Sequence, residues 1–412
     1  MLAALRSRDF RLLWLSQSAS VLGDSLVVVA IGIFVTRLTH HPSDVGLILG
    51  AYTLPLVAFV LLGGVLADRL PRQLVMIASD AVRMVVHGAL ALLIATGAVR
   101  VWHMAVIGVL FGTAQAFFQP AYTGLVPQTV VEADIASAQA LGGFSRELGI
   151  LAGPGLATAL VLGAGADYVF GVDAVTFAVS VALLSRIRTR DRGGGPAART
   201  GVLAELREGW SAVRARAWVW ATVAVFSVSL MVGLAPFFVL GAAVARHRYG
   251  TDAVYGFANV AWGVGTVSGA LVGAAWRPRR PMRAAMLAIL PWPLAVALYG
   301  LGIALPLMYA GMAVGGVGSG LFGVWWETAL AQRIPPHLLS RVSAWDWMGS
   351  LCLLPAGYLL AGPAAEAVGA TTVLAGGAFI ALLLLSAGLL PSSTRHLTRL
   401  EETAPAVDLL VM

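Results

Sequence analysis

Long apolar segments separated by short polar joints make up most of this chain of 412 residues. A helix needs about 20 mostly apolar residues to cross a bilayer, and inside lipid every backbone polar group must be satisfied within the protein. The pattern therefore predicts an all-α polytopic membrane protein with about twelve transmembrane helices. The spans are expected near residues 12–36, 45–67, 74–98, 101–122, 136–162, 168–186, 217–243, 253–276, 283–303, 305–327, 342–362 and 368–390.

The longest polar stretch divides these spans into two sets of about six. It begins at Arg186 and contains Arg-Gly-Gly-Gly-Pro at residues 192–196, a composition typical of a flexible linker. Apolar side chains from Leu203 to Val213 then recur at helical spacing, which predicts an amphipathic helix on the inner membrane surface. We expect two pseudo-symmetric six-helix bundles at 1–186 and 217–390, a cytoplasmic linker at 187–216 and a cytoplasmic tail at 391–412.

Arginine supplies all the counted basic charge, because the chain contains no lysine. The formal net charge of +7 is spread along the joints, which argues against a nucleic-acid partner. Arginines gather before the first predicted span and after the second, sixth, eighth, tenth and twelfth. The positive-inside rule therefore predicts that both termini are cytoplasmic.

Composition and missing motifs exclude several classes of activity. Charged residues make up 11% of the chain, against roughly 25% in soluble domains. One cysteine, Cys352, allows neither an intrachain disulfide nor a Cys-based metal site. The chain lacks a Gly-x-x-x-x-Gly-Lys-Ser/Thr phosphate loop, a His-Glu-x-x-His metal motif and a Gly-x-Ser-x-Gly elbow. We expect no enzymatic activity, cofactor or metal, and an integral-membrane enzyme is the alternative from another class.

The joint from Gly64 to Arg72 reads Gly-x-x-x-Asp-Arg-x-Pro-Arg and connects the second and third predicted spans. A glycine lets another helix approach closely. Asp68 beside Arg69 and Arg72 forms a charge cluster that can cap a neighbouring helix or pair across a moving interface. We expect this joint to act as a gate, whereas the simpler alternative is a solvated topogenic loop.

The six plus six spans, the central loop and this joint together resemble the major facilitator superfamily. The signature of that family between spans 2 and 3 is Gly-x-x-x-Asp-Arg-x-Gly-Arg-Arg/Lys. This chain departs from it at Pro71 and at Gln73, while the glycine, the aspartate and two arginines stand in register. The resemblance covers nearly the whole chain and implies two helical bundles around a midplane cavity that opens alternately to each side.

Further stretches resemble the drug and siderophore exporter branch of that family, which includes macrolide-efflux and enterobactin-exporter proteins. They are Phe10 to Trp14, Ser20 to Asp24, Asp80 to Arg83, Gln119 to Ala121 and Asp173 to Phe177. In the fifth span, Gly149-x-x-x-Gly153-Pro154 resembles the antiporter motif Gly-x-x-x-Gly-Pro-x-x-Gly-Gly, with Ala157 and Thr158 in place of the trailing glycines. Proline behind paired glycines also weakens the helix where spans must pack and bend.

Ionisable residues inside a membrane span mark functional sites by default. Asp24 lies midway between Arg11 and Arg37 in the sequence and so near the middle of the first span. Arg146 and Glu147 lie near the middle of the fifth span and, being consecutive, point in different directions. In this hypothesis Asp24 and Glu147 carry protons, and a structural ion pair is the alternative role for Asp24.

The remaining intramembrane charges have less distinctive positions. Arg83 and Arg146 are expected to modulate the proton carriers or to contact an anionic substrate, and Arg146 could pair with Asp24. Asp80 shares a helix face with Arg83, but it lies nearer the joint and is expected to join Arg69 and Arg72. Three other residues are expected to be structural: His87 within its span, and Glu327 and Asp346 in ordinary ion pairs near Arg333 and Arg341.

Aromatic residues in several spans suggest a cavity for a bulky substrate. Individual tryptophans are more often interface anchors, so only the group supports this interpretation. Gln119, Tyr122 and Trp326 are the residues singled out as substrate contacts. The wider group contains Tyr52, Phe117, Phe118, Trp262, Trp325, Trp345 and Trp347.

These features predict a secondary transporter that exports a bulky amphipathic compound, such as a drug or siderophore, in exchange for protons. The resemblance implies a multi-pass protein of the bacterial inner membrane, and we expect a monomer whose partners are its small-molecule substrate, protons and lipid. Proton-coupled uptake by symport is the alternative mode of transport.

The gating hypothesis makes a testable prediction about the joint. Asp68→Asn removes the only acidic charge between Gly64 and Arg72 and is expected to slow transport by purified protein in liposomes. Unchanged transport would count against a gate at this position.

Overall fold

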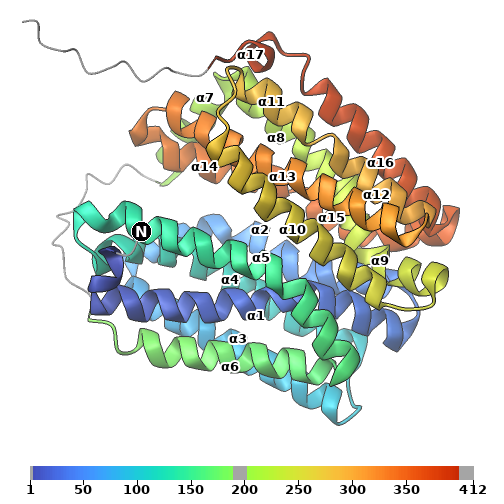
Figure 1. Cartoon of the computed structure of the whole chain (residues 1–412). Coiled ribbons are helices and arrows are strands. Elements are labelled where there is room, and N and C mark those ends of the chain that lie inside the picture. The colour runs from blue at the N-terminus through green and yellow to red at the C-terminus, as the bar shows by residue number, and fades with distance from the viewer. Residues whose placement is uncertain (1–2, 189–201, 399–412) are drawn as a thin grey trace, which may run out of the picture.

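The protein is described by a computed structural model that covers residues 3–188 and 202–398. Within those ranges the regular elements are all helices, so the predicted all-α fold is confirmed. Figure 1 shows two layers, with α1 to α6 in one and α8 to α16 in the other. The layers meet at one end and diverge toward the end that carries the N-terminus.

Six long helices build the first layer. They are α1 (Arg8–Thr39), α2 (Pro42–Arg69), α3 (Arg72–Ala95), α4 (Val101–Thr129), α5 (Ile135–Gly163) and α6 (Ala166–Leu184). The first helix starts where the Ser7 hydroxyl accepts a hydrogen bond from the Phe10 amide at 3.4 Å, which satisfies one of the free amides of the first turn. Short 3-10 turns, η1 (Ala3–Arg6) and η2 (Glu132–Asp134), precede α1 and α5.

Several helices of the second layer are interrupted. One span combines α8 (Ala217–Ser229), the π-helical turn η3 (Leu230–Leu234) and α9 (Ala235–Tyr249), and another combines α11 (Pro281–Ala288) and α12 (Pro291–Leu301). A third combines α14 (Pro336–Leu351) and α15 (Leu354–Val368). Prolines in the first turns of α9, α12 and α15 explain these breaks, because proline removes a backbone donor. The continuous helices are α10 (Ala253–Ala275), α13 (Leu305–Arg333) and α16 (Ala370–Ala387), and α17 (Ser392–Arg395) is a short terminal turn.

Among the described residues, 11 helical segments are long and apolar enough to cross a membrane. The remaining predicted span is α5, which has 29 residues but carries Arg146 and Glu147 near its middle. The predicted number of spans and the multi-pass character of the chain agree with this result.

The predicted linker at 187–216 and tail at 391–412 fall partly outside the described residues, at 189–201 and 399–412. The described part of the linker forms the expected helix, α7 (Val202–Arg214). It lies against α14, where the rings of Trp210 and Trp345 are 5.0 Å apart and Arg341 pairs with Glu208. The position of α7 on the membrane surface stays a prediction. The bounds of the two bundles, the linker and the tail also stay predictions.

The two layers contact one another at the end opposite the N-terminus. Glycines allow backbone to meet backbone there: a Cβ atom on Gly46 would collide with the carbonyl of Tyr358, and one on Gly362 would lie 2.5 Å from the Ser43 amide nitrogen. Polar bonds reinforce this end. The Ser43 hydroxyl donates to Glu366 at 2.6 Å, and Arg37 Nε donates to Asp252 Oδ2 at 2.5 Å.

The ion pair between Arg37 and Asp252 predicts how easily this end opens. Asp252 is 2% exposed and Arg37 39% exposed, so Asp252→Asn is expected to cost about 1 kcal/mol of closure and to raise the open population about fivefold. A Ser43→Cys probe on a Cys352→Ser background should then react correspondingly faster with a polar maleimide.

Asp44→Asn is the matched control, because Asp44 lies in the first turn of α2 beside the probe but is not a partner of Arg37. Equal labelling rates in the Asp252 variant and this control would contradict a closing role for the ion pair.

Candidate functional site

One arginine is buried at the centre of the first layer. Arg83 of α3 is 1% exposed, and its guanidinium carbon lies 4.3 Å from the ring centre of Phe118, 4.4 Å from that of Phe177 and 5.8 Å from that of Phe111. Aromatic faces attract a cation, most strongly where water is excluded. Three rings from α4 and α6 therefore form a fixed site for a positive charge inside the membrane region.

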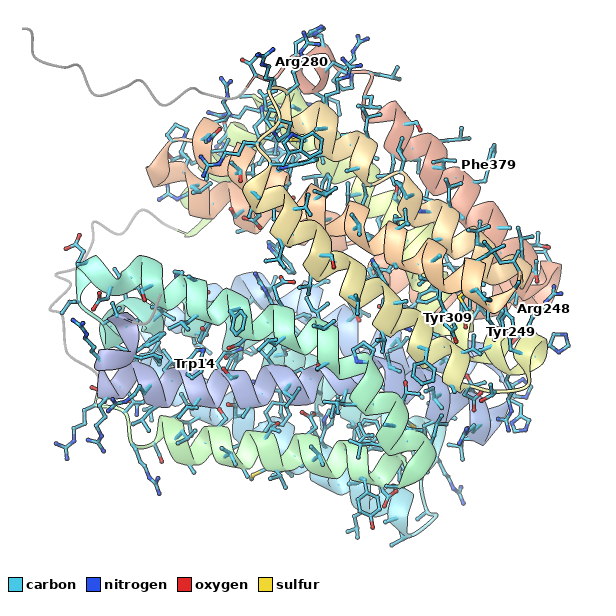
Figure 2. All side chains as sticks on the ribbon, in the orientation of Figure 1. Trp14, Arg248, Tyr249, Arg280, Tyr309 and Phe379 are labelled. Carbon is cyan, nitrogen blue, oxygen red and sulfur yellow. The ribbon has the colours of Figure 1, made fainter. Side chains whose placement is uncertain are left out.

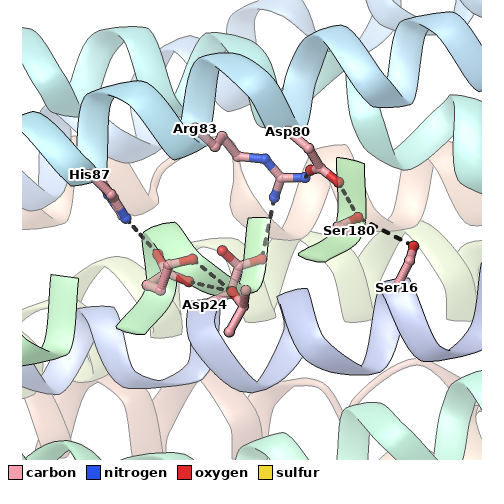
Figure 3. A network of polar contacts seen from close by, with 8 residues as sticks. Ser16, Asp24, Asp80, Arg83, His87 and Ser180 are labelled. Carbon is pink, nitrogen blue, oxygen red and sulfur yellow. Dashed lines mark hydrogen bonds and ion pairs between the residues drawn. The ribbon is translucent and has the colours of Figure 1, made fainter. Parts of the chain in front are cut away.

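Two carboxylates share this guanidinium (Figure 3). Nη2 of Arg83 pairs with Asp80 Oδ1 one helical turn away, and Nη1 lies 3.4 Å from Asp24 Oδ2 on α1. The second oxygen of Asp80 accepts a hydrogen bond from Ser180 of α6, whose hydroxyl also lies 3.2 Å from that of Ser16. Burying a charge is costly unless it is paired and hydrogen-bonded, and Asp80 meets both conditions.

The position of Asp80 corrects the sequence-based interpretation. We expected it to join Arg69 and Arg72 at the joint, but Asp80 is fully buried and bonds to Arg83 and Ser180. The spacing of three residues along α3 places Asp80 and Arg83 on one face. That face turns toward α6, which sequence spacing alone does not reveal.

A second buried pair lies one turn further along α3. His87 Nδ1 is 2.5 Å from Asp173 Oδ2 of α6, and His87 Nε2 is 3.0 Å from the hydroxyl of Tyr52 on α2. The imidazole stacks on Phe111 with ring centres 4.3 Å apart. We expected a structural role for His87 and gave Asp173 no role of its own. The signal that could have found Asp173 is its place, an acid inside an apolar span.

Asp24 differs from its neighbours in two ways. Its side chain is 26% exposed, whereas those of Arg83, Asp80, His87 and Asp173 are 1% or less. Its Oδ1 atom is itself buried and has no hydrogen-bond partner among the described residues. The network therefore has one partly exposed member, and one buried oxygen of this member is unpaired.

Helix α5 packs tightly on the turn of α1 that carries Asp24. A Cβ atom on Gly149 would lie 2.9 Å from Val21 Cγ1, and one on Gly153 would lie 2.7 Å from the Ser25 carbonyl oxygen. The glycines of the antiporter-like motif thus hold α5 against residues on either side of Asp24. Pro154 follows them inside the helix, where it cannot donate a backbone hydrogen bond.

The other predicted site residues of the first layer lie apart from the network. Glu147 is half-buried on α5 and takes no part in the contacts of Asp24 and Arg83. Arg146 is exposed on α5, and Tyr122 is half-buried on α4. The partner of Asp24 is Arg83, so the suggested pair of Arg146 with Asp24 is wrong. Gln119 is exposed on α4.

The gating joint is described only in part. The burial of Gly64 and the side chain of Asp68 lie outside what the structure describes, while Arg69 is exposed. Arg72 Nη1 donates to the carbonyl of Gly124 at 2.6 Å. Gln73, where the family signature has a base, donates to the Leu184 carbonyl at 2.7 Å. The last residue of the joint thus contacts α4, and the next residue of α3 contacts the end of α6.

The second layer contains a cavity of about 210 Å³ between α8, α13 and α14. Trp326, one of the predicted substrate contacts, lines it and donates from Nε1 to Asp346 Oδ2 at 2.9 Å. The expected ion pairs of Glu327 and Asp346 with Arg333 and Arg341 are absent among the described residues: Arg341 pairs with Glu208, and Arg333 donates to the Thr398 carbonyl. Both carboxylates line the cavity instead.

The remaining aromatic residues do not form one pocket. Tyr52 and Phe118 belong to the charge network of the first layer. Trp325 is buried and donates to the carbonyls of Gly273 and Trp276, and Trp262 lies near Ser319. Of the predicted group, Trp326 and Trp347 line the cavity. Figure 2 shows how other aromatic side chains, such as those of Trp14 and Phe379, are scattered over both layers.

A buried network in one layer and a cavity in the other suit a membrane transporter, and sequence comparison agrees. Residues 13–350 match the Major Facilitator Superfamily. The chain belongs to this family, which makes it a transporter and not an enzyme. It is 27% identical over 370 residues to the multidrug efflux pump Tap of Mycolicibacterium fortuitum, covering 84% of this chain and 87% of that protein. It is 26% identical over 198 residues to the uncharacterized MFS-type transporter YfiS of Bacillus subtilis, covering 47% and 46%.

Solved structures share the fold at low sequence identity. The nucleoside transporter NupG superposes with a TM-score of 0.70 at 14% identity, covering 93% of this chain and 98% of its own. A bacterial homolog of the human lysosomal transporter Spinster gives 0.67 at 14%, covering 94% and 95%. A POT family transporter in complex with 5-aminolevulinic acid gives 0.69 at 12%, covering 93% and 96%. These similarities support the fold alone.

The packing of α5 on α1 predicts that alanine substitutions at two glycines of α5 have opposite effects on the stability of the protein. Gly153→Ala places a methyl group against Ser25 and is expected to destabilise the protein by about 1–3 kcal/mol through overpacking. Gly143→Ala meets nothing within 4 Å, and alanine favours a helix by about 1 kcal/mol over glycine.

Thermal unfolding of the two purified variants in one detergent measures this difference. The Gly153 variant should melt below the parent protein and the Gly143 variant at or above it. Identical melting temperatures would mean that α5 does not press on α1 beside Asp24.

Proposed function

We propose that this transporter exports bulky amphipathic compounds in exchange for protons by alternating access. The carrying observation is Asp24, the partly exposed acid of an otherwise buried network, which lies 3.4 Å from Arg83 and has one unpaired carboxylate oxygen. Similarity to a multidrug efflux pump over most of both chains supports export. Uptake by symport is the alternative and would use the same acid.

Proton binding at Asp24 changes the charge balance around Arg83. When Asp24 is ionised, it competes with Asp80 for one guanidinium. When Asp24 is protonated, Asp80 remains as the partner of Arg83 and the attraction between α1 and α3 weakens. The position of α1 relative to α3 therefore depends on whether a proton is bound, which is what coupling requires.

Movement of α1 would pass to the other layer through α5. Gly149 and Gly153 hold α5 against the turn that carries Asp24. Five residues after Gly153, Thr158 meets α10 at Gly256, where an added Cβ atom would collide with the Thr158 side chain. The contacts between the layers, including Arg37 with Asp252, would then break and re-form as the two ends open in turn.

The remaining parts of the proposal concern orientation and the second proton carrier. The arginine distribution supports cytoplasmic termini, so the end where the layers diverge would face the cytoplasm. Glu147 is kept as a candidate proton carrier because it is half-buried on the helix that touches Asp24. The joint from Gly64 to Arg72 would gate the cytoplasmic end.

Reconstitution with imposed pH gradients tests the coupling. With antiport, a quaternary cation should accumulate in liposomes that are acidic inside. With symport it should accumulate in liposomes that are alkaline inside. Asp24→Asn keeps the size and polarity of the side chain but cannot exchange a proton, so gradient-driven accumulation is expected to fall about a hundredfold, the scale of losing one proton-transfer group.

Two controls accompany this experiment. Asp167→Asn changes a partly exposed acid in the first turn of α6, outside the network, and should transport like the parent protein. Downhill counterflow without a gradient should persist in Asp24→Asn, since binding and helix movement do not need net proton transfer. Full gradient-driven transport in Asp24→Asn would overturn the proposal.

A further inference from the structure

The cavity of the second layer has walls of stacked aromatic rings. The rings of Phe226 and Phe322 are 4.4 Å apart with an interplanar angle of 24°, and those of Phe322 and Trp326 are 6.1 Å apart at 12°. Trp218 meets Trp326 edge to face from outside this stack. The stack is therefore held in place by its neighbours and offers ring faces of fixed orientation to the cavity.

The charged side chains that line this cavity are acidic. Asp346 and Glu327 line it, together with the hydroxyl groups of Thr222 and Ser350. None of the described residues that line it is basic. The Asp346 carboxylate accepts a hydrogen bond from the neutral indole of Trp326 at 2.9 Å, which orients the carboxylate without neutralising it.

This arrangement contrasts with the acids of the first layer. Asp80 and Asp24 share a buried arginine, and Asp173 contacts His87. A carboxylate that is half-buried without a basic partner is costly, and a cation supplied from outside would offset that cost. Such a site lacks charge compensation until its ligand arrives.

We infer that this cavity binds the positively charged group of an aromatic organic cation. The carboxylates attract the charge, and the ring faces bind both the cation and a flat aromatic body. The volume of about 210 Å³ is below the roughly 300–1,000 Å³ of pockets that enclose drug-sized ligands, so the charged head enters and the rest lies along the exposed face of Trp347. This inference rests on the proposed export function and names its substrate class.

Equilibrium binding of ethidium, a planar aromatic cation, to the purified full-length protein tests this site without any proton gradient. Asp346→Asn retains an oxygen that can accept from Trp326 but removes the charge. Ethidium affinity measured by fluorescence anisotropy is expected to fall at least about tenfold. Glu327→Gln, at an exposed position that carries little folding risk, is expected to cost about threefold.

A neutral probe and a control variant separate charge recognition from damage to the fold. N-phenyl-1-naphthylamine should bind the parent protein and Asp346→Asn with affinities within about twofold of each other. Glu132→Gln, an exposed acid outside the cavity, should leave ethidium binding unchanged. Unchanged ethidium binding in both cavity variants, or an equal loss of the neutral probe, would overturn the inference.

The outcome is distinguishable from failure of the proposed function. Loss of ethidium binding in Asp346→Asn, in a protein that shows no gradient-driven transport, would support the cation site and contradict proton-coupled export. Gradient-driven transport that depends on Asp24, with ethidium binding insensitive to both cavity substitutions, would support export and contradict the site.

Discussion

The burial of one guanidinium group constrains the whole first layer. Arg83 cannot reach water, so its charge must be matched by Asp80 and Asp24 and surrounded by the rings of Phe118 and Phe177. These partners come from α1, α4 and α6 as well as α3, and each helix must keep its depth and rotation to supply its group. A single charge inside the membrane region thereby fixes the register of four helices, which apolar packing between similar surfaces specifies only weakly.

Much of this architecture follows from the sequence, because the bilayer leaves few alternatives to helices of about 20 residues. Span positions, the two sets of helices and the functional candidates Asp24 and Arg83 are visible as apolar runs and as charges inside them. The sequence does not show which of these charged residues pair with one another. Asp80 bonds within α3 and to α6 because of how α3 is rotated. Asp173 of α6 contacts His87 of the neighbouring helix α3. Such pairings depend on which neighbouring helix the polar face of α3 meets, and the order of residues along α3 does not determine that.

The two layers solve the problem of buried charge in different ways. In the first layer Asp80 and Asp173 are satisfied from within, by Arg83, His87 and the Ser180 hydroxyl. In the second layer Asp346 is oriented by an indole and faces a cavity. The sequence showed Asp346 beside arginines and so suggested an ordinary ion pair. The structure instead pairs Arg341 with Glu208 on α7.

The glycines where the layers meet have a consequence for how the protein responds to its surroundings. The contacts of Gly46 with the Tyr358 carbonyl and of Gly362 with Ser43 are van der Waals contacts between backbone atoms. Their strength does not depend on dissolved ions, whereas the pair of Arg37 and Asp252 is partly exposed and is screened by salt. Rising salt therefore weakens the ion pair at this end and leaves the glycine contacts unchanged. The contact between the layers thus has one part that responds to ionic strength and one part that does not.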